Sequence, residues 1–286
     1  MNTAFRHMSI LAGLLASAGG LSAQGPSTAR DLPSVYVNDG GSGPGVPVVF
    51  IHGNGGSSEQ WTAQLTAIRA NRRAIAYDLR GMGRSPVATN ADYSLDASVR
   101  DLEQVLQDAG IARVVLVGHS YGAAVAARFA AEHGDAVAGL VLVEAAGSLD
   151  IPDAAAKQLE TALRSSRDQL APQLFGPALA PSSAEVKASV LASIAKSDPS
   201  AFAATLLGLR SLDMRAAVGA YHGPRLAVAA SSVEQPAAFQ RRFPEYPLKR
   251  VDGAGHWLML DRPAEFNAIL VEFLARVDLT PGARQG

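Results

Sequence analysis

The sequence predicts an α/β protein with a mostly parallel sheet flanked by helices and a helical insertion late in the strand order. Short apolar runs alternate with amphipathic stretches along most of the chain. The runs are almost continuously apolar, which is typical of strands buried on both faces of a parallel sheet. Between residues 148 and 222 the alternation stops and only helical signals remain. A structureless loop of that length is uncommon, so we expect inserted helices there.

Each predicted strand is short, apolar and followed directly by a glycine or a polar residue. In chain order the strands are Val46 to Ile51, Ala74 to Tyr77, Val114 to Val117, Leu140 to Val143, Leu226 to Ala230 and Leu248 to Val251. The first of them follows a Gly/Pro-rich stretch, Asn38 to Gly45. Because the carboxyl ends of parallel strands meet at one edge of the sheet, we expect the chemistry to lie there.

The predicted helices begin at residues that favour helix N-termini. Ser57 with Gln60 forms a capping-box pattern, and Ser94 precedes a helix that is closed by Gly110. An alanine-rich helix follows the third strand and ends near His133. The remaining start signals are Asp153 after Pro152, Ser182 with Glu185, Asp198 before Pro199, and Asp261-Arg262-Pro263.

The composition excludes several classes of function. The 286 residues carry 25 Lys and Arg against 26 Asp and Glu, so no net positive field would attract nucleic acid. The 48% hydrophobic content is that of a packed globular protein rather than a disordered chain. The absence of cysteine excludes thiolate catalysis, disulfides and cysteine-ligated metal sites. The chemistry is therefore expected from hydroxyl, imidazole and carboxylate groups.

Residues 1–23 have the features of a secretory signal peptide. Arg6 and His7 precede an apolar run and then small residues, with cleavage expected after Ala18 or Ala23. The run is shorter than the ~18–20 residues that span a bilayer. We therefore predict a protein exported to the periplasm or secreted, without a membrane span after cleavage.

The mature chain is then divided by the insertion. We expect a core domain formed by residues 24–147 and 223–286, and a helical cap formed by residues 148–222. The sequence does not indicate an oligomeric state.

A serine stands at a predicted strand-to-helix turn. Gly118-His119-Ser120-Tyr121-Gly122 fits the G-x-S-x-G pattern. The glycines allow a tight turn that lifts the serine hydroxyl above the sheet edge, next to a helix N-terminus. Ser120 is therefore the predicted nucleophile.

A serine nucleophile needs a base, and His256 is the best placed of the six histidines. It lies just beyond the last strand, in a glycine-containing loop late in the chain. This position fits the chain order nucleophile, acid, histidine. His133 ends a helix, and His119 is expected to point away from the neighbouring hydroxyl.

Four motifs together resemble the α/β-hydrolase superfamily, and the resemblance extends from Ser34 to Val277. They are His52-Gly53-Asn54-Gly55, Asp78-Leu79-Arg80-Gly81-Met82-Gly83-Arg84-Ser85, Gly118-His119-Ser120-Tyr121-Gly122 and Gly255-His256. The resemblance implies an α/β-hydrolase fold with a helical cap after the sixth strand. It also implies an oxyanion hole formed by the backbone N–H groups of Asn54 and Tyr121, and structural roles for His52, Asp78 and Arg80.

The resemblance leaves the acid of the triad open. The commonest position, after the strand before the histidine loop, lacks an Asp and offers only Glu234. The other known position is the end of the preceding strand, where Glu144 stands. Together with the His-Gly-Asn loop, this resembles the haloalkane-dehalogenase-like branch, although that branch uses an Asp nucleophile. Glu144 is the preferred acid, Glu234 the alternative, and Asp252 a further one.

The predicted activity is that of an exported serine hydrolase that cleaves a small or medium carboxylic ester through an acyl-enzyme, without metal or cofactor. An amidase or iminopeptidase would use the same triad and would need an acid in the cap, such as Glu160, Asp168 or Glu185. A cofactor-free haloperoxidase or lyase and a non-enzymatic ligand-binding protein remain as further alternatives.

Overall fold

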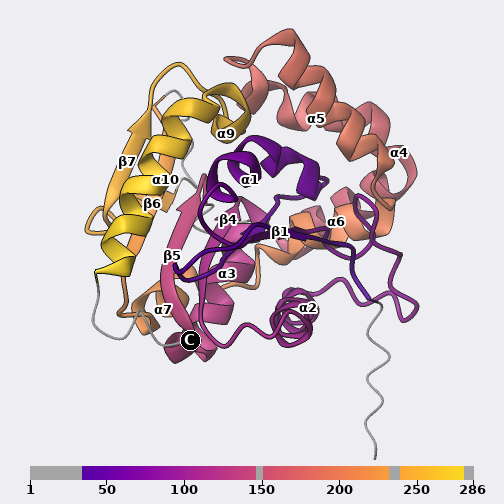
Figure 1. Ribbon diagram of the computed structural model, residues 1–286. Coiled ribbons are helices and arrows are strands. Elements are labelled where there is room, and N and C mark those ends of the chain that lie inside the picture. Colours follow the sequence, from indigo (N-terminus) through magenta and orange to yellow (C-terminus); the bar gives the residue numbers. More distant parts are fainter. Residues whose placement is uncertain (1–33, 146–150, 232–238, 280–286) are drawn as a thin grey trace, which may run out of the picture. The chain divides into compact units, whose positions relative to one another are not determined.

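A seven-stranded sheet forms the centre of the fold (Figure 1). The computed structural model describes residues 34–145, 151–231 and 239–279. The strands are β1 (Val37–Gly40), β2 (Val48–Ile51), β3 (Ala74–Tyr77), β4 (Val114–His119), β5 (Val137–Val143), β6 (Arg225–Ala230) and β7 (Leu248–Val251). Their order across the sheet is β1-β3-β2-β4-β5-β6-β7. Only β1 pairs antiparallel among these described strands, so the predicted mostly parallel sheet is confirmed.

The central strands are buried along their whole length, which explains their continuous apolar sequences. Every residue of β2, β3, β4 and β5 is buried. Successive side chains of a strand point to opposite faces. Val49 and Ile51 of β2 therefore enter one hydrophobic cluster, whereas Val48 and Phe50 enter another.

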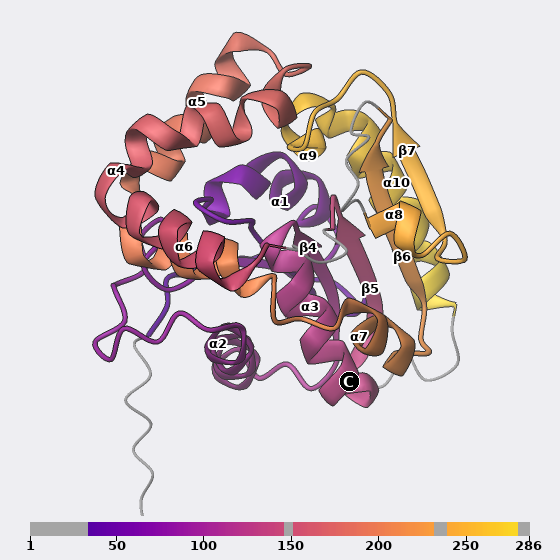
Figure 2. The ribbon, with the colours of Figure 1, turned by 180° about the vertical axis from the view of Figure 1, so that it is seen from behind.

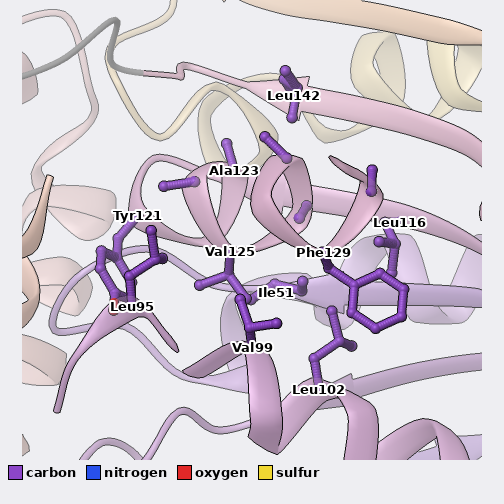
Figure 3. Packing of buried hydrophobic residues seen from close by; sticks show 14 of the residues in the cluster. Ile51, Leu95, Val99, Leu102, Leu116, Tyr121, Ala123, Val125, Phe129 and Leu142 are labelled. Carbon is purple, nitrogen blue, oxygen red and sulfur yellow. The ribbon is translucent and has the colours of Figure 1, made fainter. Parts of the chain in front are cut away.

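Helices cover both faces of this sheet. Those outside the insertion are η1 (Ser58–Trp61), α1 (Thr62–Ile68), α2 (Leu95–Asp108), α3 (Tyr121–Glu132), η2 (Gly134–Ala136), α8 (Phe239–Arg242), α9 (Leu258–Asp261) and α10 (Pro263–Asp278). Residues of α2 and α3 build the first cluster, and residues of α1, α9 and α10 build the second. Figure 3 shows Val99 and Leu102 of α2 beside Val125 and Phe129 of α3. This double covering is what a parallel sheet requires.

The helical insertion lies between β5 and β6. It contains α4 (Asp153–Leu179), α5 (Ala184–Lys196), α6 (Pro199–Gly208) and α7 (Met214–Ala220). The family resemblance implied an insertion after the sixth strand. Among the described residues, the strand that precedes the insertion is β5, the fifth. Helix α4 contacts both α5 and α6, and these three helices are grouped together in two opposite views (Figures 1 and 2). Helix α7 instead packs against α3, so the end of the insertion rejoins the core.

Two helix-cap predictions are confirmed and two are wrong. The side chains of Ser94 and Asp198 each accept a hydrogen bond from the third residue that follows, as predicted. Ser57 makes no cap bond, because a 3₁₀ turn (η1) precedes α1 and the Ser58 N–H donates to Asp78 instead. Helix α5 is capped by Ser183 rather than Ser182, because the Ser182 hydroxyl donates to Asp261 at 2.9 Å.

Strand β1 was not predicted from the sequence. Its residues overlap the stretch that was interpreted as a Gly/Pro-rich connection, Asn38 to Gly45. Pairing with β3 at Asn38↔Ala76 makes it a strand, and this partner is distant in the sequence. Within the described ranges, no helix combines the length and the apolar character that crossing a bilayer requires.

Candidate active site

The turn after β4 holds Ser120 in a strained backbone conformation. Its φ is +52° and its ψ is −112°, values that a residue with a side chain rarely adopts. The Ser120 N–H donates to the Val143 carbonyl at 2.9 Å, which fixes the turn against β5. Strain of this kind is retained where the surrounding structure imposes it, and it supports a functional role for Ser120.

The glycines around Ser120 are required by close backbone approaches. A Cβ at Gly118 would lie 2.2 Å from the Gly122 carbonyl oxygen, and a Cβ at Gly122 would lie 2.3 Å from the Ile51 oxygen. A Cβ at Gly53 would lie 3.2 Å from Ser120 Cβ. The loop after β2 therefore lies directly beside the serine.

Sheet register brings Glu144 next to Ser120. His119 of β4 pairs with Val143 of β5, so the two residues that follow these strands emerge side by side. Glu144 also has a positive φ, +48°, and its N–H donates to the Val228 carbonyl at 2.9 Å. Its carboxylate therefore lies at the strand edge where the chemistry was expected.

Glu144 and His256 form a hydrogen-bonded pair. Glu144 Oε2 lies 3.0 Å from His256 Nδ1, and the two side chains are 4% and 18% exposed. The other carboxylate oxygen accepts a hydrogen bond from the Ala230 N–H. A carboxylate at Nδ1 favours the tautomer with the proton on that atom, which leaves Nε2 as the basic nitrogen.

The structure distinguishes among the predicted acids where they are described. Glu144 contacts the histidine, as preferred from the sequence. Asp252 is exposed, and its backbone carbonyl, rather than its carboxylate, accepts a hydrogen bond from Arg262. Glu234 lies outside the described residues.

Ser120 and His256 come from segments that lie beside each other in the structure. Within the described ranges, no hydrogen bond joins Ser120 Oγ to the His256 ring. The His256 ring lies 4.8 Å from the ring of His119, the residue before the serine. Catalytic hydrogen bonds of a resting site are often long and tighten when substrate binds.

Two backbone N–H groups are available to bind an oxyanion. Within the described part of the chain, the N–H groups of Asn54 and Tyr121 donate to no protein acceptor. The Tyr121 N–H is at the N-terminus of α3, where the helix dipole favours negative charge. The Tyr121 phenol points into the core and lies 3.0 Å from Ser98 Oγ, and burial raises its pKa. The backbone of Tyr121, not its side chain, is therefore the group that this arrangement offers.

The pattern of site and fold agrees with a known family. Residues 48–269 match the alpha/beta hydrolase family. This chain belongs to the alpha/beta hydrolase family.

Three known proteins are similar to this chain in sequence or in structure. A protein of Variovorax paradoxus named "Putative carbamate hydrolase RutD" is 33% identical over 261 residues, covering 85% of this chain and 96% of that protein. A thermophilic esterase from Thermogutta terrifontis, solved with malate bound, has a TM-score of 0.75 and 25% identity over 85% of this chain and 93% of that one. A bromoperoxidase from Bacillus anthracis has a TM-score of 0.73 and 24% identity, covering 84% and 95% of the two chains. The likeness to the bromoperoxidase shows the fold alone.

Two further histidines of this hydrolase are buried and uncharged near neutral pH. Burial lowers the pKa of His52, whose Nε2 accepts a hydrogen bond from the Leu79 N–H at 2.9 Å. Burial and the nearby His256 hold the pKa of His119 well below its usual range. His119 Nε2 donates to the His256 carbonyl at 2.9 Å, so His119 supports the loop that carries His256. This contact was not predicted from the sequence.

Asp78 and Arg80 have the structural roles that the family resemblance implied. The Asp78 carboxylate accepts hydrogen bonds from the N–H groups of Ser58 and Arg84. Arg80 pairs with Asp101, and both side chains are 1% exposed. These contacts connect the loops behind the sheet edge.

The insertion reaches the site through contacts that the sequence did not reveal. Thr205 Oγ1 donates to Asn54 Oδ1 at 2.7 Å, and Ser193 Oγ donates to the Gly55 carbonyl at 2.9 Å. The Asn54 Nδ2 atom is buried and has no hydrogen-bond partner in the described part of the chain. Single serines and threonines in helices carry no local signal for such long-range contacts, so sequence reasoning could not single them out.

The acids suggested for holding a substrate amine lie elsewhere. Glu160 pairs with Arg164, one helical turn away, and Asp168 pairs with Arg167. Glu185 is exposed near the N-terminus of α5. None of the three has a recorded contact with the described active-site residues.

Proposed function

We propose that this hydrolase cleaves a small or medium carboxylic ester through a covalent acyl-enzyme. The observation that carries the proposal is the hydrogen-bonded pair of buried Glu144 and half-buried His256 beside the strained Ser120 turn. In the proposed first step, His256 Nε2 takes the hydroxyl proton while Ser120 Oγ attacks the ester carbonyl carbon. Glu144 stabilises the imidazolium that forms.

The remaining steps use the same groups. The N–H groups of Asn54 and Tyr121 stabilise the negative oxygen of the tetrahedral intermediate. His256 then gives its proton to the leaving alcohol, and the acyl group stays on Ser120. Water, deprotonated by His256, attacks the acyl carbon and releases the carboxylic acid and the free serine.

An ester is favoured over an N-terminal peptide bond by the position of the acids. A substrate ammonium group would need a carboxylate near the site that is not already paired. Among the described residues, Glu144 is hydrogen-bonded to His256, and Glu160, Asp168 and Glu185 make no contact with the site. A neutral substrate agrees better with this distribution of charge.

A carbamate is the second candidate substrate. The similarity to the Variovorax protein named as a carbamate hydrolase, over 96% of its length, supports this alternative. Ser120 Oγ would attack the carbamate carbonyl carbon, the bond from that carbon to the alcohol oxygen would break, and His256 would give its proton to the leaving alcohol, which leaves a carbamoyl-serine. Water would then have to hydrolyse that more stable intermediate.

Labelling and turnover of the purified protein test both candidates. Treatment with a fluorophosphonate should give one adduct, on Ser120, with parallel loss of p-nitrophenyl acetate, butyrate and octanoate hydrolysis. Steady turnover of a p-nitrophenyl carbamate at a comparable rate would favour the carbamate. Absence of both the adduct and turnover in the folded protein would contradict a hydrolase and favour a ligand-binding role.

Export is also part of the proposal. It is supported by the pattern of residues 1–23, which lie outside the described residues. Expression of the full chain with a C-terminal tag, followed by fractionation and intact mass, should give a periplasmic or secreted species cleaved after Ala18 or Ala23. An uncleaved cytoplasmic product would contradict it.

A further inference from the structure

We propose that Asp261 and Ser182 are positioning residues that hold the His256 loop against the helical insertion, an inference that rests on the proposed role of His256 as the base. Asp261 ends α9, and Ser182 lies between α4 and α5. The catalytic histidine is thus positioned by the insertion as well as by the sheet.

The first contact is made by the residue before the histidine. The Gly255 N–H donates to Asp261 Oδ2 at 2.8 Å, and Ser182 Oγ donates to the same oxygen at 2.9 Å. One carboxylate oxygen therefore joins the base loop to the insertion. Hydrogen bonds to a charged acceptor are stronger than neutral ones.

Space at Gly255 shows how closely the two segments approach. A Cβ at Gly255 would lie 2.6 Å from the Ala178 carbonyl oxygen and 2.9 Å from Ser182 Oγ. Only glycine fits between the loop and the insertion without displacing backbone.

The backbone of His256 is itself held on both sides. Its N–H donates to the Ala178 carbonyl at 3.0 Å, from the end of α4. Its carbonyl accepts from His119 Nε2 at 2.9 Å, from the nucleophile turn. Phe175 of α4 packs edge-on against Trp257, with ring centroids 5.7 Å apart. The insertion and the core therefore fix the peptide that carries the imidazole.

The second oxygen of Asp261 argues for a role beyond stability. Asp261 Oδ1 is buried and has no hydrogen-bond partner among the described residues. Leaving a carboxylate oxygen unpaired costs free energy, and Asp261 bears this cost while its other oxygen accepts from the Gly255 N–H and the Ser182 hydroxyl. A surface groove of about 550 Å³, lined in part by Ser182, Asp261 and Arg262, lies beside this junction.

Four variants of the full mature chain test the proposal. Asp261→Ala removes the acceptor that Gly255 and Ser182 share, and Asp261→Asn keeps one oxygen acceptor. Ser182→Ala removes only the hydrogen bond from the insertion to Asp261. Ser183→Ala is the matched control, because it removes the cap of α5 without touching Asp261. Turnover is expressed per active site after titration with a fluorophosphonate.

We expect Asp261→Ala to lower kcat per titrated site about 10- to 100-fold with KM within about twofold, because small displacements of a base are costly. Ser182→Ala should lower it about two- to fivefold, and Asp261→Asn should recover most of the loss. Ser183→Ala should lower the melting temperature with kcat per site unchanged. Equal kcat per site in Asp261→Ala and the wild type would overturn the proposal.

A second measurement is independent of turnover. The Nδ1 proton of His256, held by Glu144, should give a downfield proton resonance that Asp261→Ala broadens or removes and Ser183→Ala leaves in place. This result would uphold the positioning role even if the wild type hydrolysed no ester, in which case only the proposed function fails. An unchanged resonance in Asp261→Ala would contradict the positioning role.

Discussion

The sheet edge and the helical insertion contribute to the same site in different ways. Ser120 and Glu144 each follow a strand directly, and sheet register places them side by side. The insertion instead approaches the site through hydrogen bonds between residues that are far apart in the sequence, such as Thr205 to Asn54 and His256 to Ala178. Under the proposed function, the sheet edge carries the reacting groups and the insertion adjusts their positions. Substitutions at the edge should therefore abolish activity, whereas those in the insertion should reduce it in steps.

Replacing the nucleophile should have the largest effect. Ser120→Ala should lower kcat by at least ~10³-fold, because the remaining groups cannot form an acyl-enzyme. Circular dichroism and melting temperature should show that the variant remains folded. Residual activity within tenfold of the wild type would place the chemistry elsewhere.

The acid comes next. Glu144→Gln should lower kcat by about 10²- to 10⁴-fold, because an amide supports the wrong tautomer of His256 and cannot stabilise its charge. Glu234→Gln and Asp252→Asn provide matched controls in the other two predicted positions. A loss confined to Glu234→Gln would transfer the role of the acid to that residue.

Substitutions at two glycines, one beside the sheet edge and one in the insertion, should change the free energy of unfolding in opposite directions. Gly122→Ala should lower the free energy of unfolding by about 2–4 kcal/mol, since its Cβ would collide with the Ile51 backbone. Gly176→Ala, in α4 with no atom within 4 Å of the new Cβ, should raise it by up to ~1 kcal/mol. Chemical denaturation measures both, and similar losses in the two variants would refute the contrast.

Substitution of Thr205 tests whether the insertion helps to position Asn54. Thr205→Val keeps the shape but frees the Asn54 amide to rotate, so kcat/KM should fall about three- to tenfold. Thr161→Val is the control, because Thr161 also bonds the carbonyl four residues earlier in an insertion helix but is exposed. A loss as large as that of Glu144→Gln would mean that the insertion takes a direct part in the reaction.

The last prediction concerns the pH dependence of stability. His52 and His119 have lowered pKa values in the folded protein. At a pH between the lowered pKa of each histidine and its unfolded pKa of ~6.5, only the unfolded chain therefore binds the proton. Below pH 6.5 the free energy of unfolding should therefore fall with decreasing pH, by up to ~1.4 kcal/mol per pH unit for each histidine. His119→Gln should flatten this dependence in urea titrations between pH 5 and 7. An equal slope in the variant would contradict the assignment.

Much of the site was predictable because its signals are local. The G-x-S-x-G turn needs its glycines for backbone reasons that the sequence displays directly, and the structure shows the corresponding close approaches. Glu144 was preferred from its position at a strand end, which the structure places beside His256. The Ser57 cap failed because an intervening 3₁₀ turn, fixed by Asp78, cannot be seen in a capping pattern.

The sequence by itself determined the α/β class, the strand ends and the tight glycine-flanked turn at Ser120, because these depend on hydrophobic periodicity and on short-range steric requirements. Only the tertiary structure decided that β1 is a strand, that Ser182 bonds Asp261 rather than α5, and that Thr205 and Ala178 reach the site. Those outcomes depend on partners that are mostly far away in the sequence. The physical reason is that a polar group takes the partner that folding brings within hydrogen-bond distance, and no local pattern encodes that distance.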